Sequence, residues 1–439
     1  MMKKLFLLTV LFSGTTLFAQ EINFDKLDKY LENLEKNDKF MTSIAISKNG
    51  EIIYQNSIGF ADVENQIRAD HRTIYKIGSI SKTFTATLVM KAVEESKLSL
   101  DQALSDFFPD VENAEKITLK NLLNHQSGIF NLTSDPTFFD WHTNAHTPTE
   151  ILDIIKRNGT VFEPGSQTEY SNSNYMLLTL ILEKVYNQTF DEILQGKITQ
   201  PLGLKNTYIG YEINPKNHEA HSYQFIGKWV KETETHSSVT LGAGAIVSTA
   251  EELVKFSDAL FSGKIISEES LKKMLDMENN FGLGMTRFPF YEKVCLGHTG
   301  GIDGFSSIFS HIREDNLSYA VLNNGTNFDN NDVYIAILST VYGKDFEIPV
   351  FTPGYQPTEE NLQKYIGTYS SPLIPMKITI TTENGVLIAQ ATSQPSFPLE
   401  AVEEHIFKFD MAMLKMTFNP DDNTMILNQG GEILFKKEK

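Results

Sequence analysis

The tetrapeptide Ser79-Ile80-Ser81-Lys82 constrains this chain most, because it stands at the head of an apolar run spaced as one face of a helix. That run consists of Phe84, Leu88, Val89, Ala92 and Val93. Ser79 follows Gly78, so we expect strand or loop to turn into helix at this point. A lysine three residues after a serine lies one helical turn away on the same face, so Ser79 and Lys82 can touch.

Ser79 and Lys82 are the residue types of a nucleophile and its base. A serine hydroxyl is a weak nucleophile until a neighbouring base takes its proton. The ammonium form of Lys82 cannot accept a proton, so this role requires burial or nearby positive charge to lower the pKa of Lys82 toward neutrality. A helix start also exposes backbone N–H groups, and we expect that of Ser79 to point at the carbonyl oxygen under attack.

The same spacings occur elsewhere, so no single motif identifies a site. The S-x-x-K spacing recurs at Ser270 and Lys273, within serines and acids typical of an ordinary helix start. The Y-x-N spacing recurs at Tyr54, beside the turn dipeptide Asn49-Gly50, which predicts a hairpin of residues 44–47 and 52–55. We therefore interpret Ser270 as part of a helix cap and Tyr54 as a strand residue.

Tyr170-Ser171-Asn172 follows a Pro-Gly turn and precedes an expected helix at residues 176–185, so this motif should lie on a loop tip. A tyrosine near a lysine ammonium can become a phenolate and shuttle protons. An asparagine amide can hold Lys82 and a substrate carbonyl together. The alternative for Tyr170 is a buried tyrosine whose hydroxyl is satisfied by a structural hydrogen bond.

His298-Thr299-Gly300-Gly301 follows a strand-like run at residues 294–296. Glycine lets a strand edge approach a substrate closely, so the N–H of Gly301 is the candidate second donor of an oxyanion hole. A histidine in a strand is usually structural. We assign His298 to the site because it completes, in chain order, the set begun by Ser79 and Tyr170.

In this order and separation, the three motifs resemble those of the serine β-lactamase and penicillin-binding D,D-peptidase superfamily, specifically its class C-like branch. The likeness covers roughly residues 23–350 and includes Leu-Leu-Asn-His-Gln-Ser-Gly at 122–128, Pro-Leu-Gly-Leu at 201–204 and Gly-Ala-Gly-Ala-Ile-Val-Ser-Thr at 242–249. The resemblance implies that Ser79 is acylated, while Lys82 and Tyr170 share base and acid work. It also implies that the substrate-binding residues are Asn172, His298, Thr299, Gly300 and Gly301.

One position departs from many members of that superfamily, whose β-lactamases and many D,D-peptidases have lysine where this chain has His298. A lysine there is a cation able to hold a substrate carboxylate, whereas histidine is mostly neutral at pH 7. The histidine form is found in relatives described as D,D-peptidases, D-amino-acid peptidases and esterases. We therefore expect a peptidase-type serine hydrolase, with carboxylesterase or β-lactamase activity as alternatives. A catalytically silent protein that binds cell-wall peptides is the alternative outside enzymology.

The N-terminal 19 residues resemble a secretory signal, with Lys3 and Lys4 before a short apolar run and Ala19 before the expected cut. The run is shorter than the roughly 20 residues that span a bilayer, so we expect a secreted or periplasmic chain without stable membrane insertion. A membrane anchor is the alternative.

The formal net charge is −18, and loss of the two lysines would make it −20, which disfavours nucleic acid and anionic lipid as partners. A small-molecule or short-peptide substrate is the expected partner, and the oligomeric state stays open.

The length of 439 residues, with 41% apolar residues, suggests two domains. Residues 20–352 mix helices, such as an amphipathic one from Phe24 to Leu34 and a capped one from Thr147, with antiparallel strands. This mixture indicates an α+β fold, and the resemblance implies a β-lactamase-like antiparallel sheet flanked by helices. Alternating strands at residues 357–439 predict an all-β barrel or sandwich, which resembles the lipocalin-like C-terminal domain of some superfamily members.

Cofactor chemistry is not expected. Cys295 is the single cysteine, so no internal disulfide can form, and its apolar strand predicts a buried, inert thiol. The pairs His142 with His146 and His218 with His221 do not form the H-E-x-x-H motif of zinc enzymes.

Three aromatic side chains lie among polar residues in the segment 130–146: Phe138, Phe139 and Trp141. They form either an aromatic wall over a cleft or a small separate core, and the sequence leaves both interpretations open.

Overall fold

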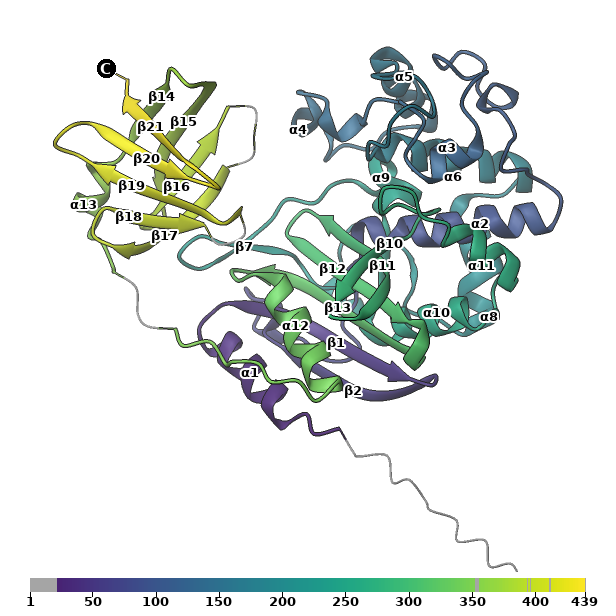
Figure 1. Cartoon of the computed structure of the whole chain (residues 1–439), viewed down its shortest axis with the longest axis horizontal. Coiled ribbons are helices and arrows are strands. Elements are labelled where there is room, and N and C mark those ends of the chain that lie inside the picture. Colours follow the sequence, from purple (N-terminus) through teal and green to yellow (C-terminus); the bar gives the residue numbers. More distant parts are fainter. Residues whose placement is uncertain (1–21, 352–354, 393, 395, 410–411, 439) are drawn as a thin grey trace, which may run out of the picture.

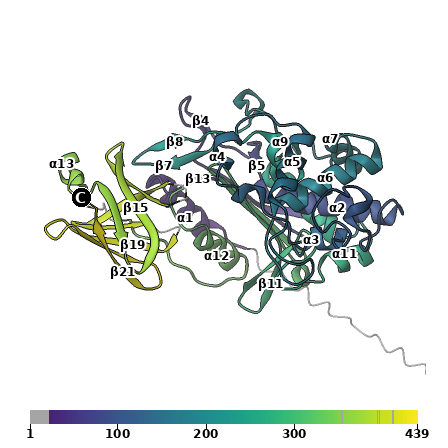
Figure 2. The ribbon, with the colours of Figure 1, turned by 90° about the horizontal axis from the view of Figure 1, so that it is seen from above.

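The computed structural model describes residues 22–438 apart from 352–354, 393, 395 and 410–411, so the expected signal at residues 1–19 lies outside the described part. The chain forms an α+β body followed by a C-terminal β-barrel that carries the C-terminus (Figure 1). Viewed from above, the barrel lies at one end of the molecule and helices such as α2 (Ser81–Glu94) at the other (Figure 2). The predicted fold class is confirmed.

The main sheet of the α+β body has its strands in the order β10-β11-β12-β13-β1-β2, all antiparallel. Its strands are β1 (Phe40–Lys48), β2 (Glu51–Ile58), β10 (Thr286–Phe290), β11 (Lys293–Ile302), β12 (Phe305–Ile312) and β13 (Leu317–Thr326). A short ribbon of β7 (Tyr223–Phe225) and β8 (Trp229–Lys231) extends from β13. Asn49 and Gly50 have φ of +56° and +81°, as the predicted hairpin turn requires.

Helices cover both faces of this sheet. On one face, α1 (Asp25–Lys36) buries Leu27, Leu31 and Leu34 together with α12 (Asn330–Val341), which confirms the predicted amphipathic first helix. On the other face, α10 (Ala250–Phe261) packs on β1, β12 and β13. The sheet is therefore the middle of three layers, and its central strands β1, β12 and β13 are buried on both sides.

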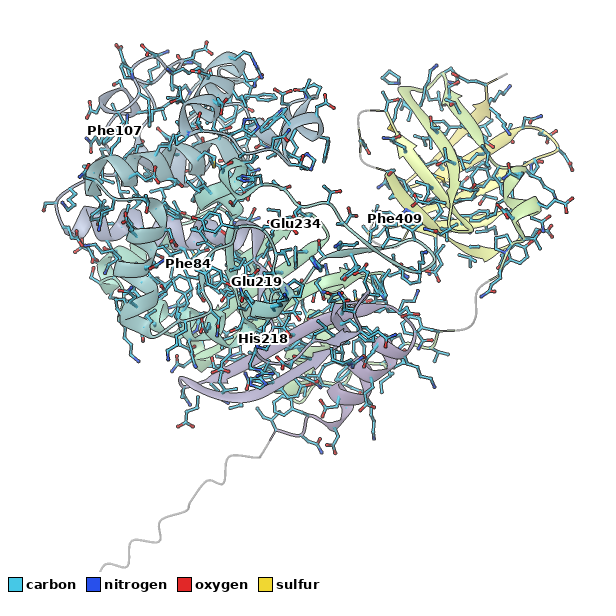
Figure 3. All side chains as sticks on the ribbon, turned by 180° about the vertical axis from the view of Figure 1, so that it is seen from behind. Phe84, Phe107, His218, Glu219, Glu234 and Phe409 are labelled. Atoms are coloured by element: carbon cyan, nitrogen blue, oxygen red, sulfur yellow. The ribbon has the colours of Figure 1, made fainter. Side chains whose placement is uncertain are left out.

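A helical layer built around α2 and α6 (Asn172–Tyr186) contains the largest core. Almost every residue of α2 is buried. Phe84 of α2, labelled in Figure 3, stacks on Phe256 of α10, and their ring centroids lie 3.7 Å apart. The predicted cap of α5 (Pro148–Asn158) is confirmed, because Thr147 and Glu150 form a capping box with Pro148 in the first turn.

The other α-helices of this body are α3 (Leu119–Leu123), α4 (Phe138–Trp141), α5 (Pro148–Asn158), α7 (Phe190–Leu194), α8 (Gln200–Leu202), α9 (Ser237–Gly244) and α11 (Glu268–Met274). Short 3₁₀ and π turns are η1 (Gly78–Ile80), η2 (Leu104–Asp106), η3 (Leu132–Ser134), η4 (Gln195–Thr199), η5 (Pro215–Asn217) and η6 (Arg313–Asp315). Two small sheets complete the body: β3 (Phe60–Asp62) with β4 (Ile67–Arg68), and β5 (Tyr75–Lys76) with β9 (Ile246–Ser248) and β6 (Tyr208–Ile209).

The C-terminal unit is a closed antiparallel barrel in sequential order, preceded by α13 (Glu359–Gln363). Its strands are β14 (Gly367–Ser371), β15 (Ile374–Glu383), β16 (Val386–Ala391), β17 (Ser396–Glu403), β18 (Ile406–Phe409), β19 (Leu414–Asn419), β20 (Thr424–Asn428) and β21 (Glu432–Lys437). Closure leaves no free sheet edge, and inward side chains such as Phe407, Met416 and Phe435 fill the interior. Of the two predicted architectures, barrel or sandwich, the structure therefore has the barrel.

Candidate active site

Ser79 lies where β5 ends and the chain turns through η1 into α2, as predicted. Gly78 has φ of +52°, and a Cβ there would lie 2.8 Å from the backbone nitrogen of Gly301. Glycine at position 78 thus lets the nucleophile turn approach β11 directly. Two segments more than 200 residues apart meet beside Ser79.

The Lys82 side chain is completely buried and contacts three oxygen atoms. Its Nζ lies 3.0 Å from Ser79 Oγ, 2.7 Å from Asn172 Oδ1 and 2.7 Å from the carbonyl of Ala243. Burial lowers the pKa of Lys82 well below its ordinary value. The ammonium form of Lys82 can donate to all three oxygens, whereas in the neutral form the two carbonyl oxygens take its two N–H groups and leave its lone pair for the Ser79 hydroxyl.

Tyr170 lies on the other side of the nucleophile, with its hydroxyl 2.7 Å from Ser79 Oγ. Burial raises the pKa of Tyr170, which favours the protonated phenol. The resting site therefore favours a proton-donating Tyr170, in contrast to the phenolate expected beside a lysine ammonium.

Asn172 is the first residue of α6, which begins four residues earlier than expected, with Ser171 as its N-cap. Its Oδ1 accepts from Lys82, while its Nδ2 donates to Asn131 Oδ1 at 3.2 Å and Thr133 Oγ1 at 3.0 Å. Both ends of the amide are engaged by the protein. Asn172 thus orients Lys82, and its N–H groups are already used within the chain.

The segment 298–301 of β11 forms one wall of the site. Within the described part of the chain, β10 pairs only with residues 293–297, so 298–301 have a strand neighbour on the β12 side alone. Ile302 pairs with Phe305 across a two-residue turn, and this register directs the N–H groups of Thr299 and Gly301 away from β12. Gly301 is therefore placed to offer an N–H to the cleft.

Gly300 and Gly301 have different surroundings. A Cβ on Gly300 would collide with the Ile77 carbonyl and Ser307 Oγ, whereas a Cβ on Gly301 would meet nothing within 4 Å. We expected these glycines to admit a substrate. For Gly300 the close approach is instead to the chain's own backbone before Ser79.

His298 is 4% exposed, and burial lowers its pKa to about 4, so the ring is neutral at pH 7. Its Nδ1 lies 2.5 Å from the carbonyl of Thr299, which can only accept, so Nδ1 carries the proton. The ring centroid lies 6.5 Å from that of Tyr170. His298 therefore lines the site as a neutral group.

A cavity of about 500 Å³ brings most of the predicted residues together, namely Ser79, Tyr170, His298, Thr299 and Gly301. Lys82 and Asn172 lie behind Ser79, and Gly300 packs under the wall. The cavity also contains an exposed cation that was not predicted, Arg287 of β10, whose Nε donates to Asn280 Oδ1 at 3.0 Å. A hairpin pattern before residue 294 could have revealed it, since Arg287 pairs with Leu296 in β11.

His125 is a second residue that was not assigned a role from the sequence. Its Nδ1 accepts from the Ser171 N–H at 3.2 Å, and its ring centroid lies 4.4 Å from that of Tyr170. Burial lowers the pKa of His125 well below its ordinary value, so a neutral ring supports the tyrosine. The segment 122–128 had been noted only as part of a resemblance.

The competing motifs have structural partners. Ser270 belongs to the first turn of α11, where its N–H donates to Ser267 Oγ at 3.2 Å, and Tyr54 donates from its hydroxyl to Asp28 Oδ1 at 2.7 Å. Both interpretations are confirmed. Cys295 is buried as predicted, and burial raises the pKa of its thiol to about 11.

The aromatic residues of α4 form neither a separate core nor a wall of the site cavity. Phe138 is buried in the main core and Trp141 packs against it, whereas Phe139 is 64% exposed. Among the residues described, no three His, Cys, Asp or Glu side chains are grouped to hold a metal ion. No helix in the described ranges has both the length and the apolar character to cross a bilayer.

Comparison with known families places these residues in context. A family model described as Beta-lactamase matches residues 30–342. The chain is 29% identical over 272 residues to the putative penicillin-binding protein PbpX of Bacillus subtilis (strain 168), covering 60% of this chain and 65% of that protein. It is also 29% identical over 314 residues to protein flp of Staphylococcus aureus (strain N315), covering 68% and 62%. The chain thus spans slightly less than two thirds of these relatives.

Two solved structures are similar over nearly their whole length. One is a D-amino acid amidase from Ochrobactrum anthropi SV3, with a TM-score of 0.64 and 26% identity, covering 73% of this chain and 99% of that one. The other is the octameric penicillin-binding protein homologue from Pyrococcus abyssi, with a TM-score of 0.64 and 25% identity, covering 94% and 99%. The second match extends beyond the α+β body.

Proposed function

Because the chain belongs to the Beta-lactamase family of serine hydrolases, we propose that it is a secreted or periplasmic member of the class C-like branch. In this proposal it cleaves short peptides that end in a D-amino acid, through an acyl-enzyme on Ser79. The observation that carries the proposal is the position of Ser79 Oγ, 3.0 Å from Lys82 Nζ and 2.7 Å from the Tyr170 hydroxyl. These are hydrogen-bonding distances for a nucleophile between a base and an acid.

In the proposed acylation, neutral Lys82 takes the proton of Ser79 while Oγ attacks the scissile carbonyl. The N–H groups of Ser79 and Gly301 stabilise the negative oxygen that develops. The C–N bond then breaks, and Tyr170 donates its proton to the departing nitrogen; the proton on Lys82 replaces it as the site resets. Water attacks the Ser79 ester in the second half-reaction and releases the acid.

The substrate class follows from the charges around the cleft. His298 is neutral at pH 7, so it offers no cation to a carboxylate, whereas the Arg287 guanidinium lines the same cavity as Ser79. A guanidinium binds a carboxylate through two parallel N–H groups. A peptide whose C-terminal carboxylate reaches Arg287 would place its last amide bond near Ser79. The likeness to a D-amino acid amidase supports a D-residue beside that bond.

The acyl-enzyme is tested by intact-protein mass after exposure to a fluorophosphonate. Wild type should gain one adduct and Ser79→Ala none. Ser270→Ala is the matched control, because Ser270 has the same S-x-x-K spacing but belongs to a helix cap, and it should be labelled like wild type. An unmodified wild type would support a silent binding protein and overturn the proposal.

The role of Arg287 is tested with substrate pairs that differ only in the terminal carboxylate. Arg287→Ala should raise KM for D-alanyl peptides with a free C-terminus by about 10-fold to 100-fold, since a charge-assisted hydrogen-bonded pair contributes roughly 1.5–3 kcal/mol. It should leave KM for the corresponding peptides with a C-terminal amide unchanged. Equal effects on both would remove the carboxylate from the proposal, and a wild type that prefers short acyl esters by orders of magnitude would indicate an esterase.

A further inference from the structure

A buried ion pair lies outside the groups used so far, in the turn that follows β11. Asp303 Oδ2 lies 3.1 Å from Lys76 Nζ, and its Oδ1 accepts from the N–H of Thr235 at 2.9 Å and from its hydroxyl at 2.6 Å. The side chains of Lys76 and Asp303 are only 6% and 2% exposed. Glu234, in the loop after β8 and labelled in Figure 3, adds a second carboxylate, which lies 3.3 Å from Lys76 Nζ.

The pair joins the two backbone segments that carry the proposed oxyanion donors. Lys76 ends β5, three residues before Ser79, and Asp303 comes two residues after Gly301. Between them, the Gly78 turn and the Gly301 nitrogen are in close contact. The ion pair therefore ties the two segments together close to this contact.

The turn itself does not need an aspartate. Asp303 has φ of +53°, whereas the φ of Gly304 is not positive. A two-residue hairpin turn with this combination favours glycine at its first position, which is here Asp303. Burying two charges is also costly unless both are well paired. The chain keeps a residue that is unfavourable for its backbone position and uses its carboxylate for three contacts, which indicates a role beyond turn formation.

We propose that Lys76 and Asp303 are positioning residues that hold the N–H of Gly301 at the correct distance from the N–H of Ser79 to form the oxyanion hole. This inference rests on the proposed function, because it concerns the same reaction. Neither side chain touches the substrate. Their effect is on the stabilisation of the transition state and not on substrate binding.

The test compares a short acyl ester with its thionoester, in which sulfur replaces the carbonyl oxygen that the two N–H groups would bind. Lys76→Met and Asp303→Asn should lower kcat for the oxygen ester by up to the roughly 100-fold to 1,000-fold found when an oxyanion donor is lost. KM should change little, and the rate ratio of ester to thionoester should fall toward one. Thr235→Val, which removes a single hydroxyl contact, should shift the ratio less but in the same direction.

Lys293→Met is the matched control. Lys293 is the first residue of β11, at the end of the strand far from Gly301, and its Nζ lies 2.9 Å from Asp315 Oδ2. This variant should leave the ratio as in wild type, and Lys76→Arg should restore part of the loss in Lys76→Met. An unchanged ratio in the Lys76 and Asp303 variants would overturn the inference while leaving the proposed function intact. A wild type that hydrolyses neither ester and is not labelled at Ser79 would overturn both.

Discussion

At the scale of single residues, the site depends on removing a lysine from water. Lys82 retains three hydrogen-bond partners after burial, but two of them are neutral carbonyl oxygens and the third is a hydroxyl, so no carboxylate holds the ammonium form. The folded chain therefore favours the neutral amine, which is the form that can act as a base.

Lys82→Met should change how stability depends on pH. Between the lowered folded pKa of Lys82 and its ordinary value of 10.5, the unfolded chain binds a proton that the folded chain does not, so wild-type stability rises with pH. The free energy of unfolding of wild type relative to Lys82→Met should thus increase with pH across this window and level off above 10.5. Urea unfolding at a series of pH values measures it.

Lys36→Met, at an exposed position of α1, is the control and should show no comparable slope. Parallel stability curves for wild type and Lys82→Met would mean that the lysine is charged in the folded chain. That result would remove it as the resting base.

The sequence predicted which single residues meet, but not everything that surrounds them. The spacing of Ser79 and Lys82 on one helical turn placed them together, since this relation is local. The Ala243 carbonyl and the His125 ring reach the site only through tertiary packing, and a backbone carbonyl leaves no mark on residue identity. Residue type predicted a mostly neutral His298, but the further lowering of its pKa and the raised pKa of Tyr170 depend on burial.

At the scale of elements, β11 combines a substrate wall with a packing surface. Gly300 lets the strand press on the backbone before Ser79, while Gly301 faces open space one residue later. The alternation of a strand assigns these two tasks to neighbouring glycines.

Gly300→Ala and Gly301→Ala should therefore behave differently. The added methyl group at 300 meets the Ile77 carbonyl, so Gly300→Ala should destabilise the fold by roughly 1–3 kcal/mol or more and displace the strand. Gly301→Ala should leave the free energy of unfolding within about 0.5 kcal/mol of wild type. Thermal and urea unfolding compare them, and equal destabilisation of both would contradict the assignment.

Helices and hairpins with strong local signals were predictable, whereas strand faces were less so. The Thr147 capping box and the Asn49-Gly50 turn are written in adjacent residues. In β16 almost every residue is apolar, so composition cannot choose the inward face. The pairing of Glu383 with Val386 sets the register there, and it buries Leu387 and Ala389 completely.

At the scale of the whole molecule, the contacts between the barrel and the α+β body include an ion pair. Lys39, just before β1, lies 3.3 Å from Glu400 of β17, with side-chain exposures of 11% and 41%. The turn before β16 also packs on Gly227 of the ribbon formed by β7 and β8. Such a contact orients the barrel without a large shared core.

Reversing the charge of Lys39 should uncouple the unfolding of the barrel from that of the body, and reversing both charges should restore the coupling. Lys39→Glu should separate barrel and body unfolding in calorimetry, because like charges then face each other. The double variant Lys39→Glu with Glu400→Lys should restore part of the loss, by about 0.2–1 kcal/mol for a partly exposed pair. A double variant no more stable than the sum of the single changes would mean that the pair contributes nothing to the joint.

The one-sided pairing of residues 298–301 limits which polypeptides the site can accept. A polypeptide can bind along this strand edge only if its own backbone N–H and C=O groups are not already hydrogen-bonded and its backbone can become extended. In folded proteins, the backbone amide groups are already hydrogen-bonded within sheets and helices. A hydrolase with this strand edge would leave folded proteins intact and would act on short, unstructured peptides.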